Sequence, residues 1–156
     1  MNAVNTLAQT YDMPILYSCH PRSQKYIEQR NFVFDPHVIR HQPLGFFDYN
    51  KLQQNAFCVV SDSGTLPEES AFFNFPAVSV RTSTERPEAM DKGRFVIGSI
   101  TSEQVLQAVE LVVTMHKNGD NGAPVPAYTD ENVSTKVVKI IQSYTGIINK
   151  MVWQKN

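Results

Sequence analysis

Three short stretches of the sequence carry side chains that bind anions or exchange protons. The first is "SDSGTLPEES" at 61–70, which follows the apolar run "AFCVV" and contains hydroxyl groups, a glycine and two adjacent carboxylates. The others are "CHPRS", with His20 before a proline, and "RTSTERPEAM", with Arg81, Glu85 and Arg86. Hydroxyls, backbone amides and guanidinium groups hold phosphate, and imidazole exchanges protons near neutral pH. The residue types therefore favour a small ligand that carries phosphate.

The stretch at 61–70 has both a structural and a ligand-binding interpretation. The letters T-L-P-E fit the helix-capping pattern, with Thr65 as the N-cap and Glu68 three residues later. Ser63 and Gly64 precede that helix, where a hydroxyl and free amides would face the positive end of its dipole and suit a phosphate. Glu69 is better matched to the paired hydroxyls of a ribose. A solvated first-turn glutamate remains the alternative for Glu69.

The remaining candidates each have two readings. His20 lies at the end of a predicted strand. It either faces the cleft as an acid, a base or an oxyanion donor, or it makes a structural hydrogen bond. Arg86 precedes a proline in an extended segment, suited to reach a phosphate or to lock the loop through a carboxylate. Tyr49 could stack on a base, whereas core packing is the expectation for Phe46 and Phe47.

The elements that would position these groups alternate between helix and strand. Short apolar runs predict strands at "ILYSC", "HVIRH", "FCVVS", "AVSVR" and "RFVIG". Between them lie helical stretches near 23–29, 47–56 and 66–73, with an opening helix before the first strand and another at 102–115. Strands joined by helical crossovers pair in parallel, so we expect a doubly wound, Rossmann-like α/β sheet. Ligands of such sheets bind outside the carboxyl ends of the strands, where all three stretches fall.

Composition narrows the class of protein. The chain of 156 residues has the size of one domain, and 42% hydrophobic residues are enough to bury a core. A net charge of −1 with no basic run argues against nucleic acid, and no segment is apolar enough to predict a membrane span. Cys19 and Cys58 lie in apolar runs outside any metal spacing, which predicts buried thiols in a reducing compartment. We expect a cytoplasmic protein.

The motifs together resemble a known family. "HP" after a strand, "SDSG" followed by "EES", and "FPAVSVRTSTERPEA" are similar to the carboxyl-terminal domain of the non-hydrolysing UDP-N-acetylglucosamine 2-epimerases, over about residues 14–115. The resemblance implies one half of a cytoplasmic enzyme with two Rossmann-like domains in the GT-B arrangement. "HPRS", "GFFDYN" and the tail "VVKIIQSYTGIINKMVW" look closest to the branch that makes UDP-N-acetyl-L-fucosamine for capsule or O-antigen.

The resemblance also implies a reaction and the residues that serve it. Members of the family are isomerases that need no dissociable redox cofactor or metal. They remove the proton at C2 of the sugar and expel UDP from C1, which leaves a 2-acetamidoglycal. UDP and a proton are then added back to give the opposite configuration at C2. His20 would be the active-site histidine. The nucleotide would be bound by Ser63, Gly64 and Thr65 at the diphosphate, Glu69 at the ribose, Tyr49 near uracil and Arg86 completing the site. A glycine common in the family is replaced by Thr65, which favours its backbone amide over its hydroxyl as the contact.

The expected organisation has three parts. Residues 1–117 would form the Rossmann-like nucleotide-sugar-binding domain, 118–132 a loop, and 133–156 a helical segment that packs on an amino-terminal domain not found in this sequence. The full enzyme would bind a UDP-N-acetyl sugar and form a homo-oligomer, whereas this chain alone would bind UDP weakly and not epimerise. Two alternatives stay open: the nucleotide-binding half of a GT-B glycosyltransferase, and a non-catalytic module that binds UDP-sugars.

Overall fold

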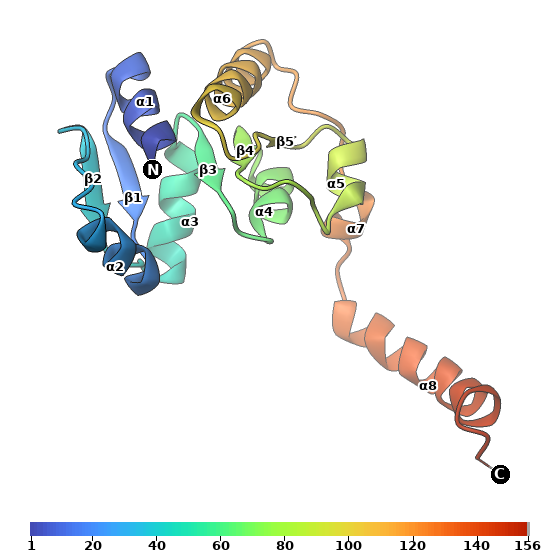
Figure 1. Ribbon diagram of the computed structural model, residues 1–156. Helices are drawn as coiled ribbons and strands as arrows, with labels where there is room; N and C mark the ends of the chain where they lie inside the picture. Colours follow the sequence, from blue (N-terminus) through green and yellow to red (C-terminus); the bar gives the residue numbers. More distant parts are fainter. Residues whose placement is uncertain (156) are drawn as a thin grey trace. The chain divides into compact units, whose positions relative to one another are not determined.

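The computed structural model describes residues 1–155, and helices and strands alternate over residues 2–117 (Figure 1). The strands are β1 (Ile15–Ser18), β2 (Val38–His41), β3 (Val59–Ser61), β4 (Ala77–Ser79) and β5 (Val96–Ile97). The helices are α1 (Asn2–Tyr11), α2 (Pro21–Gln29), α3 (Phe46–Asn55), α4 (Leu66–Phe73), α5 (Pro87–Asp91), α6 (Ser102–Lys117), α7 (Pro126–Thr129) and α8 (Val133–Met151). The alternation that the sequence predicts through α6 is confirmed.

The ladders between the strands are all parallel. In one group β1 pairs with β2, and Ile15 lies opposite Val38. In the other group β4 lies between β3 and β5, and Val78 lies opposite both Val60 and Val96. Parallel pairing with helical crossovers confirms the α/β class. The sequence predicts one open sheet, whereas in residues 1–155 the backbone hydrogen bonds form these two groups, because the paired segments are only two to four residues long.

Three helices that begin with a proline depart from the sequence prediction. The prediction starts α2 at Ser23, but the helix begins at Pro21, because proline at the first position lacks only an amide that has no partner in a helix. The segment expected to be turns at 82–93 contains α5, which also opens with a proline. The connection expected over 118–132 contains α7. Prolines at first helical positions account for all three.

The core is built around α6 and β4. The three residues of β4 are all buried, so this strand has neighbours on both sides and both faces. Apolar side chains of α6 recur every three or four residues and form one face. Together with Leu7 of α1 and Val78 of β4, that face forms the main cluster, whose α6 members are Val105, Ala108, Val109, Val112 and Val113. The packing fixes β4 and therefore the loops that follow its carboxyl end.

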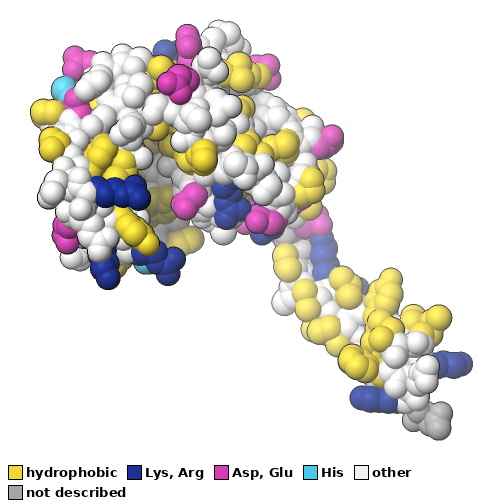
Figure 2. Space-filling model, in the orientation of Figure 1, with side chains coloured by type: hydrophobic (Ala, Val, Ile, Leu, Met, Phe, Trp, Pro, Cys, Tyr) yellow, Lys and Arg dark blue, Asp and Glu magenta, His cyan; other side chains and the backbone are white. Residues whose placement is uncertain are grey.

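The chain divides into two compact units, residues 1–125 and 126–156. In the second unit α8 is amphipathic, yet none of its residues is buried. Its apolar side chains, which Figure 2 shows gathered along the helix, include Val137, Ile140, Ile141, Ile147 and Ile148. Among the described residues, no helix is both long and apolar enough to cross a membrane.

Candidate functional site

The candidate residues lie where the strands of the first unit end. His20 follows β1, Ser63 and Gly64 follow β3, and Arg86 is carried by the loop after β4. Tyr49 lies in the first turn of α3, which follows β2. Because the strands within each group are parallel, the carboxyl ends of that group face the same edge, which is the usual place for a ligand in such folds. The predicted segments therefore all lie at carboxyl ends of strands.

The loop before α4 is organised by hydroxyl groups. The Ser63 amide donates to Ser61 Oγ at 3.1 Å, and the Thr65 amide donates to Ser63 Oγ at 3.3 Å. Within residues 1–155 the Gly64 amide has no hydrogen-bond partner, and a Cβ at this glycine would meet nothing within 4 Å. An open glycine amide beside a helix N-terminus is a donor for an anion. The loop is thus compatible with a phosphate contact.

Thr65 is the N-cap of α4, as the sequence predicts, but the capping hydrogen bonds expected of Thr65 and Glu68 are not formed. Thr65 is the N-cap of α4 but has φ −88° and ψ −11°, and its side chain makes no capping hydrogen bond. A side-chain cap requires an extended backbone at this position, whereas Thr65 is already helical. Its hydroxyl instead donates to Glu69 Oε1 at 2.8 Å, and Glu68 binds an arginine from another loop.

Glu69 is held at both carboxylate oxygens. Besides the Thr65 hydroxyl on Oε1, the Gln53 side-chain amide donates to Oε2 at 2.6 Å. Tyr49 belongs to the same cluster: burial first, and then the charge of Glu69, raise the pKa of Tyr49, while hydrogen bonds with Ser61 and Gln53 lower it. The balance keeps the phenol protonated at neutral pH. Tyr49, Thr65 and Glu69 are therefore brought together, with Ser63 bonded to Thr65 at 3.0 Å between their hydroxyls.

Sequence reasoning missed Gln53, which is only 2% exposed. The available signal was its spacing, because residues four apart lie on the same face of a helix and Gln53 follows Tyr49 by four positions. The same helix corrects a second expectation, since Phe46 and Phe47 are 73% and 85% exposed rather than packed in the core. The buried face of α3 is formed by Asn50 and Gln53, which leaves the two phenylalanines of the first turn outside.

Arg86 is tied to α4. Its Nε donates to Glu68 Oε1 at 2.5 Å, and one of its terminal nitrogens donates to the Glu85 carbonyl at 3.1 Å. Arg81 connects the same loop to the one after β3, because its Nε donates to the Asp62 carbonyl at 2.7 Å. Arg81 also donates to the Glu85 carboxylate, and this hydrogen bond lowers the pKa of Glu85. Arg86 and Arg81 therefore tie the loop after β4 to α4 and to the loop after β3.

His20 has a structural contact and a side that remains available. It is exposed and caps α2, with its Nδ1 accepting the Arg22 amide at 3.2 Å. An Nδ1 that accepts carries no proton, so the neutral ring carries it on Nε2 and can donate there. The end of β1 lies near the loop after β3, because the charge of Asp62 in that loop acts on Tyr17 in β1. Burial is the main cause that raises the pKa of Tyr17, and the charge of Asp62 is a smaller one. No described contact joins His20 to the Glu69 cluster.

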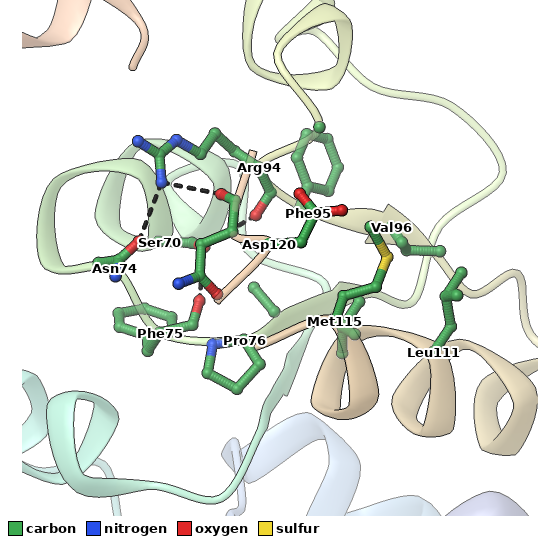
Figure 3. A pocket seen from close by; sticks show the side chains of 14 residues that line it. Ser70, Asn74, Phe75, Pro76, Arg94, Phe95, Val96, Leu111, Met115 and Asp120 are labelled. Carbon is green, nitrogen blue, oxygen red and sulfur yellow. Dashed lines mark hydrogen bonds between the residues drawn. The ribbon is translucent and has the colours of Figure 1, made fainter. Parts of the chain in front are cut away.

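A cavity of about 270 Å³ lies at the opposite edge of the strands (Figure 3). It is lined by Phe75 and Pro76, which precede β4, and by Arg94 and Phe95, which precede β5. The Arg94 guanidinium donates to Asn74 Oδ1 at 3.0 Å and, through Nε, to the Ala123 carbonyl at 2.7 Å. These bonds fasten the connection that follows α6, and the cavity contains none of the predicted site residues.

Within the part of the chain that the structure describes, no three histidine, cysteine, aspartate or glutamate side chains come together in a group that could hold a metal ion. Cys19 is buried as predicted, whereas Cys58 is half-buried rather than fully enclosed. Burial nevertheless raises the pKa of the Cys58 thiol to about 12, so it is not a nucleophile at neutral pH.

Comparison with known proteins gives consistent matches. A family model described as UDP-N-acetylglucosamine 2-epimerase matches residues 1–142. The UDP-N-acetylglucosamine 2-epimerase of Methanococcus maripaludis is 28% identical over 145 residues, which cover 90% of this chain and 38% of that protein. The structure of UDP-N-acetylglucosamine 2-epimerase from Rickettsia bellii superposes with a TM-score of 0.82 at 37% identity, covering 99% of this chain and 43% of that one.

A further solved structure supports the fold. The Methanocaldococcus jannaschii UDP-GlcNAc 2-epimerase in complex with UDP-GlcNAc and UDP has a TM-score of 0.77 at 23% identity, and it covers 91% of this chain and 39% of that one. The chain thus spans about two fifths of the length of the relatives it matches.

Proposed function

Since this chain belongs to the UDP-N-acetylglucosamine 2-epimerase family, we propose that it supplies the UDP-binding half of the active site of a UDP-N-acetyl-hexosamine 2-epimerase. The observation that carries the proposal is the Glu69 carboxylate, held at both oxygens beside an open loop at the N-terminus of α4. A carboxylate next to phosphate donors suits a nucleoside diphosphate, in which a ribose diol lies a few ångströms from the diphosphate.

Each residue then has a part in holding UDP. The Gly64 amide would donate to the diphosphate, and the Ser63 hydroxyl would join it by turning its proton from Thr65 Oγ1 to the phosphate. The positive end of the α4 dipole would also stabilise the charge of the diphosphate. The Thr65 amide is already engaged, because it donates to Ser63 Oγ. The part of Thr65 would therefore be to hold the Glu69 carboxylate through its hydroxyl. Glu69 would accept from the ribose hydroxyls, and the protonated phenol of Tyr49, which interacts with Glu69, would approach the base. Arg86 would complete the site by fixing its loop against α4.

The proposed reaction eliminates UDP from C1 after loss of the C2 proton and then reverses on the opposite face. Elimination places negative charge on the departing diphosphate, so donors that face the diphosphate lower the barrier. The Nε2 proton of His20 would be one such donor, since Nδ1 is engaged by α2. The group that abstracts the C2 proton would come from the part of the relatives that this chain does not cover.

We propose that α8 also contributes to a two-domain protein. Its exposed apolar face, which includes Ile140, Ile141 and Ile148, would pack on an amino-terminal domain of a two-domain family member. The resemblance of "HPRS", "GFFDYN" and the tail "VVKIIQSYTGIINKMVW" supports the UDP-N-acetyl-L-fucosamine branch as the finer assignment. We expect the 156-residue chain alone to bind UDP weakly and to leave C2 of a UDP-N-acetyl sugar unchanged; turnover detected by NMR of the sugar would contradict this.

Substitution of Glu69 tests the proposal directly. Loss of the carboxylate in Glu69→Ala should weaken UDP binding by roughly 1–3 kcal/mol, because two ribose hydroxyls lose a charged acceptor. Protein-detected NMR titration with millimolar UDP measures weak affinities of this kind. Glu110→Ala is the control, since Glu110 is an exposed glutamate in the middle of α6, away from the carboxyl ends of the strands. Equal UDP affinity of Glu69→Ala and the unsubstituted chain would refute the ribose assignment.

A further inference from the structure

Gln53 has features that packing does not explain. It lies on α3, is 2% exposed, and donates through Nε2 to Glu69 Oε2 at 2.6 Å. We infer that Gln53 is a positioning residue, which fixes the Glu69 carboxylate in advance for a ribose diol. The inference rests on the proposed function, since it concerns the carboxylate to which ribose binding is assigned.

The grip on Glu69 comes from two separate elements. Gln53 approaches Oε2 from α3, and Thr65 approaches Oε1 from the N-cap of α4 at 2.8 Å. A carboxylate whose two oxygens are each held by a donor cannot rotate freely about its last side-chain bond. Each oxygen still has acceptor capacity, because an ionised carboxylate offers about four lone-pair sites. The remaining capacity is arranged as two neighbouring acceptors, the arrangement that a vicinal diol requires.

The orientation of the Gln53 amide follows from the charge of its partner. If the amide were reversed, its oxygen would face the carboxylate at hydrogen-bond distance, and two acceptors would repel each other. The donor end therefore faces Glu69. The consequence is visible at the other end, where Gln53 Oε1 is buried and has no hydrogen-bond partner within residues 1–155.

A buried acceptor without a partner destabilises the folded state. Methionine has nearly the same length and volume as glutamine, and it would occupy the site without a polar atom to satisfy. A residue chosen only to pack α3 against α4 would thus be better as methionine. Glutamine at this position makes sense when its hydrogen bonds, to Glu69 and to Tyr49 of its own helix, have a use that outweighs the orphaned oxygen.

The test compares stability with ribose recognition in the complete 156-residue chain. We would titrate the unsubstituted chain, Gln53→Met and Glu69→Ala with UDP and with 2′-deoxyuridine diphosphate by protein-detected NMR, and unfold each in urea. Gln53→Met should lower UDP affinity about fivefold and 2′-deoxyuridine diphosphate affinity much less, because a freed carboxylate loses its alignment with the diol. Its urea midpoint should be unchanged or higher.

The outcomes separate the two proposals. If Glu69→Ala abolishes the preference for UDP but Gln53→Met keeps it, the inference is overturned and the proposed function stands. If Gln53→Met unfolds the chain, or weakens both nucleotides equally at any urea midpoint, Gln53 does not position Glu69 for the ribose and the inference is again overturned. An unsubstituted chain that binds neither nucleotide, or binds both alike, overturns the ribose assignment together with the inference.

Discussion

The ion pair between Arg86 and Glu68 should hold the loop after β4 onto the first turn of α4. The Nε–Oε1 distance is 2.5 Å, and the two side chains are 35% and 33% exposed. Fully exposed pairs contribute about 0.2–1 kcal/mol, whereas hydrogen bonds to charged groups in less exposed places contribute about 1.5–3 kcal/mol. For a pair that is one-third exposed, we expect a coupling free energy of about 1 kcal/mol.

A double-mutant cycle with Arg86→Met, Glu68→Gln and the double variant measures this coupling. Methionine keeps the apolar stem of the arginine, and glutamine keeps the shape of the glutamate, so mainly the charges are removed. Urea unfolding of the four proteins gives the free energies, and the coupling should fall at high salt because the pair is partly solvated. Arg86→Met should cost somewhat more than Glu68→Gln, since it also loses the bond to the Glu85 carbonyl.

The same four proteins test how Arg86 contributes to the proposed UDP site. If it acts by fixing the loop, Arg86→Met and Glu68→Gln weaken UDP binding by similar factors, and the double variant is little worse than either. A loss for Arg86→Met that exceeds the loss for Glu68→Gln about tenfold would instead indicate a direct contact with the diphosphate. A coupling indistinguishable from zero at low salt would refute the structural reasoning itself.

Two further predictions concern stability. Gly122 has φ +73°, and a Cβ there would lie 2.3 Å from the Lys92 carbonyl oxygen, so Gly122→Ala should cost about 3 kcal/mol. Gly119→Ala, at φ +81° with no atom within 4 Å of its Cβ, should cost only about 1 kcal/mol in the same urea titration, and equal losses would contradict the clash. Burial raises the pKa of the Cys58 thiol from 9.0 to about 12, so the unfolded chain releases this proton at lower pH than the folded one. The stability that this thiol contributes is fully present below pH 9.0 and is lost as the pH rises toward about 12. The urea midpoint of Cys58→Ala should therefore fall less at alkaline pH than the midpoint of the unsubstituted chain. Identical falls would refute the argument.

Much of the fold follows from local pattern. Apolar residues at intervals of three and four in α6, such as Val105, Ala108 and Val112, indicate a helix with one buried face through their spacing alone. Short apolar runs between helices indicate parallel strands, because a helical crossover returns the chain to the same edge. For the same reason the positions of His20 and Ser63 at carboxyl ends of strands could be predicted. The motif resemblance then identified the family.

The partners of the side chains could not be predicted in this way. Glu68 satisfies a capping pattern but binds Arg86, eighteen positions away, and Gln53 reaches Glu69 across sixteen positions from a different helix. Phe46 and Phe47 have large apolar side chains, which are typical of a core, but they lie on the exposed first turn of α3. The sequence by itself determined the class of fold and the positions of the candidate residues after the strands, because both depend on periodicity and connection. Only the tertiary structure decided which donor meets which carboxylate, because that depends on how separate helices and loops pack.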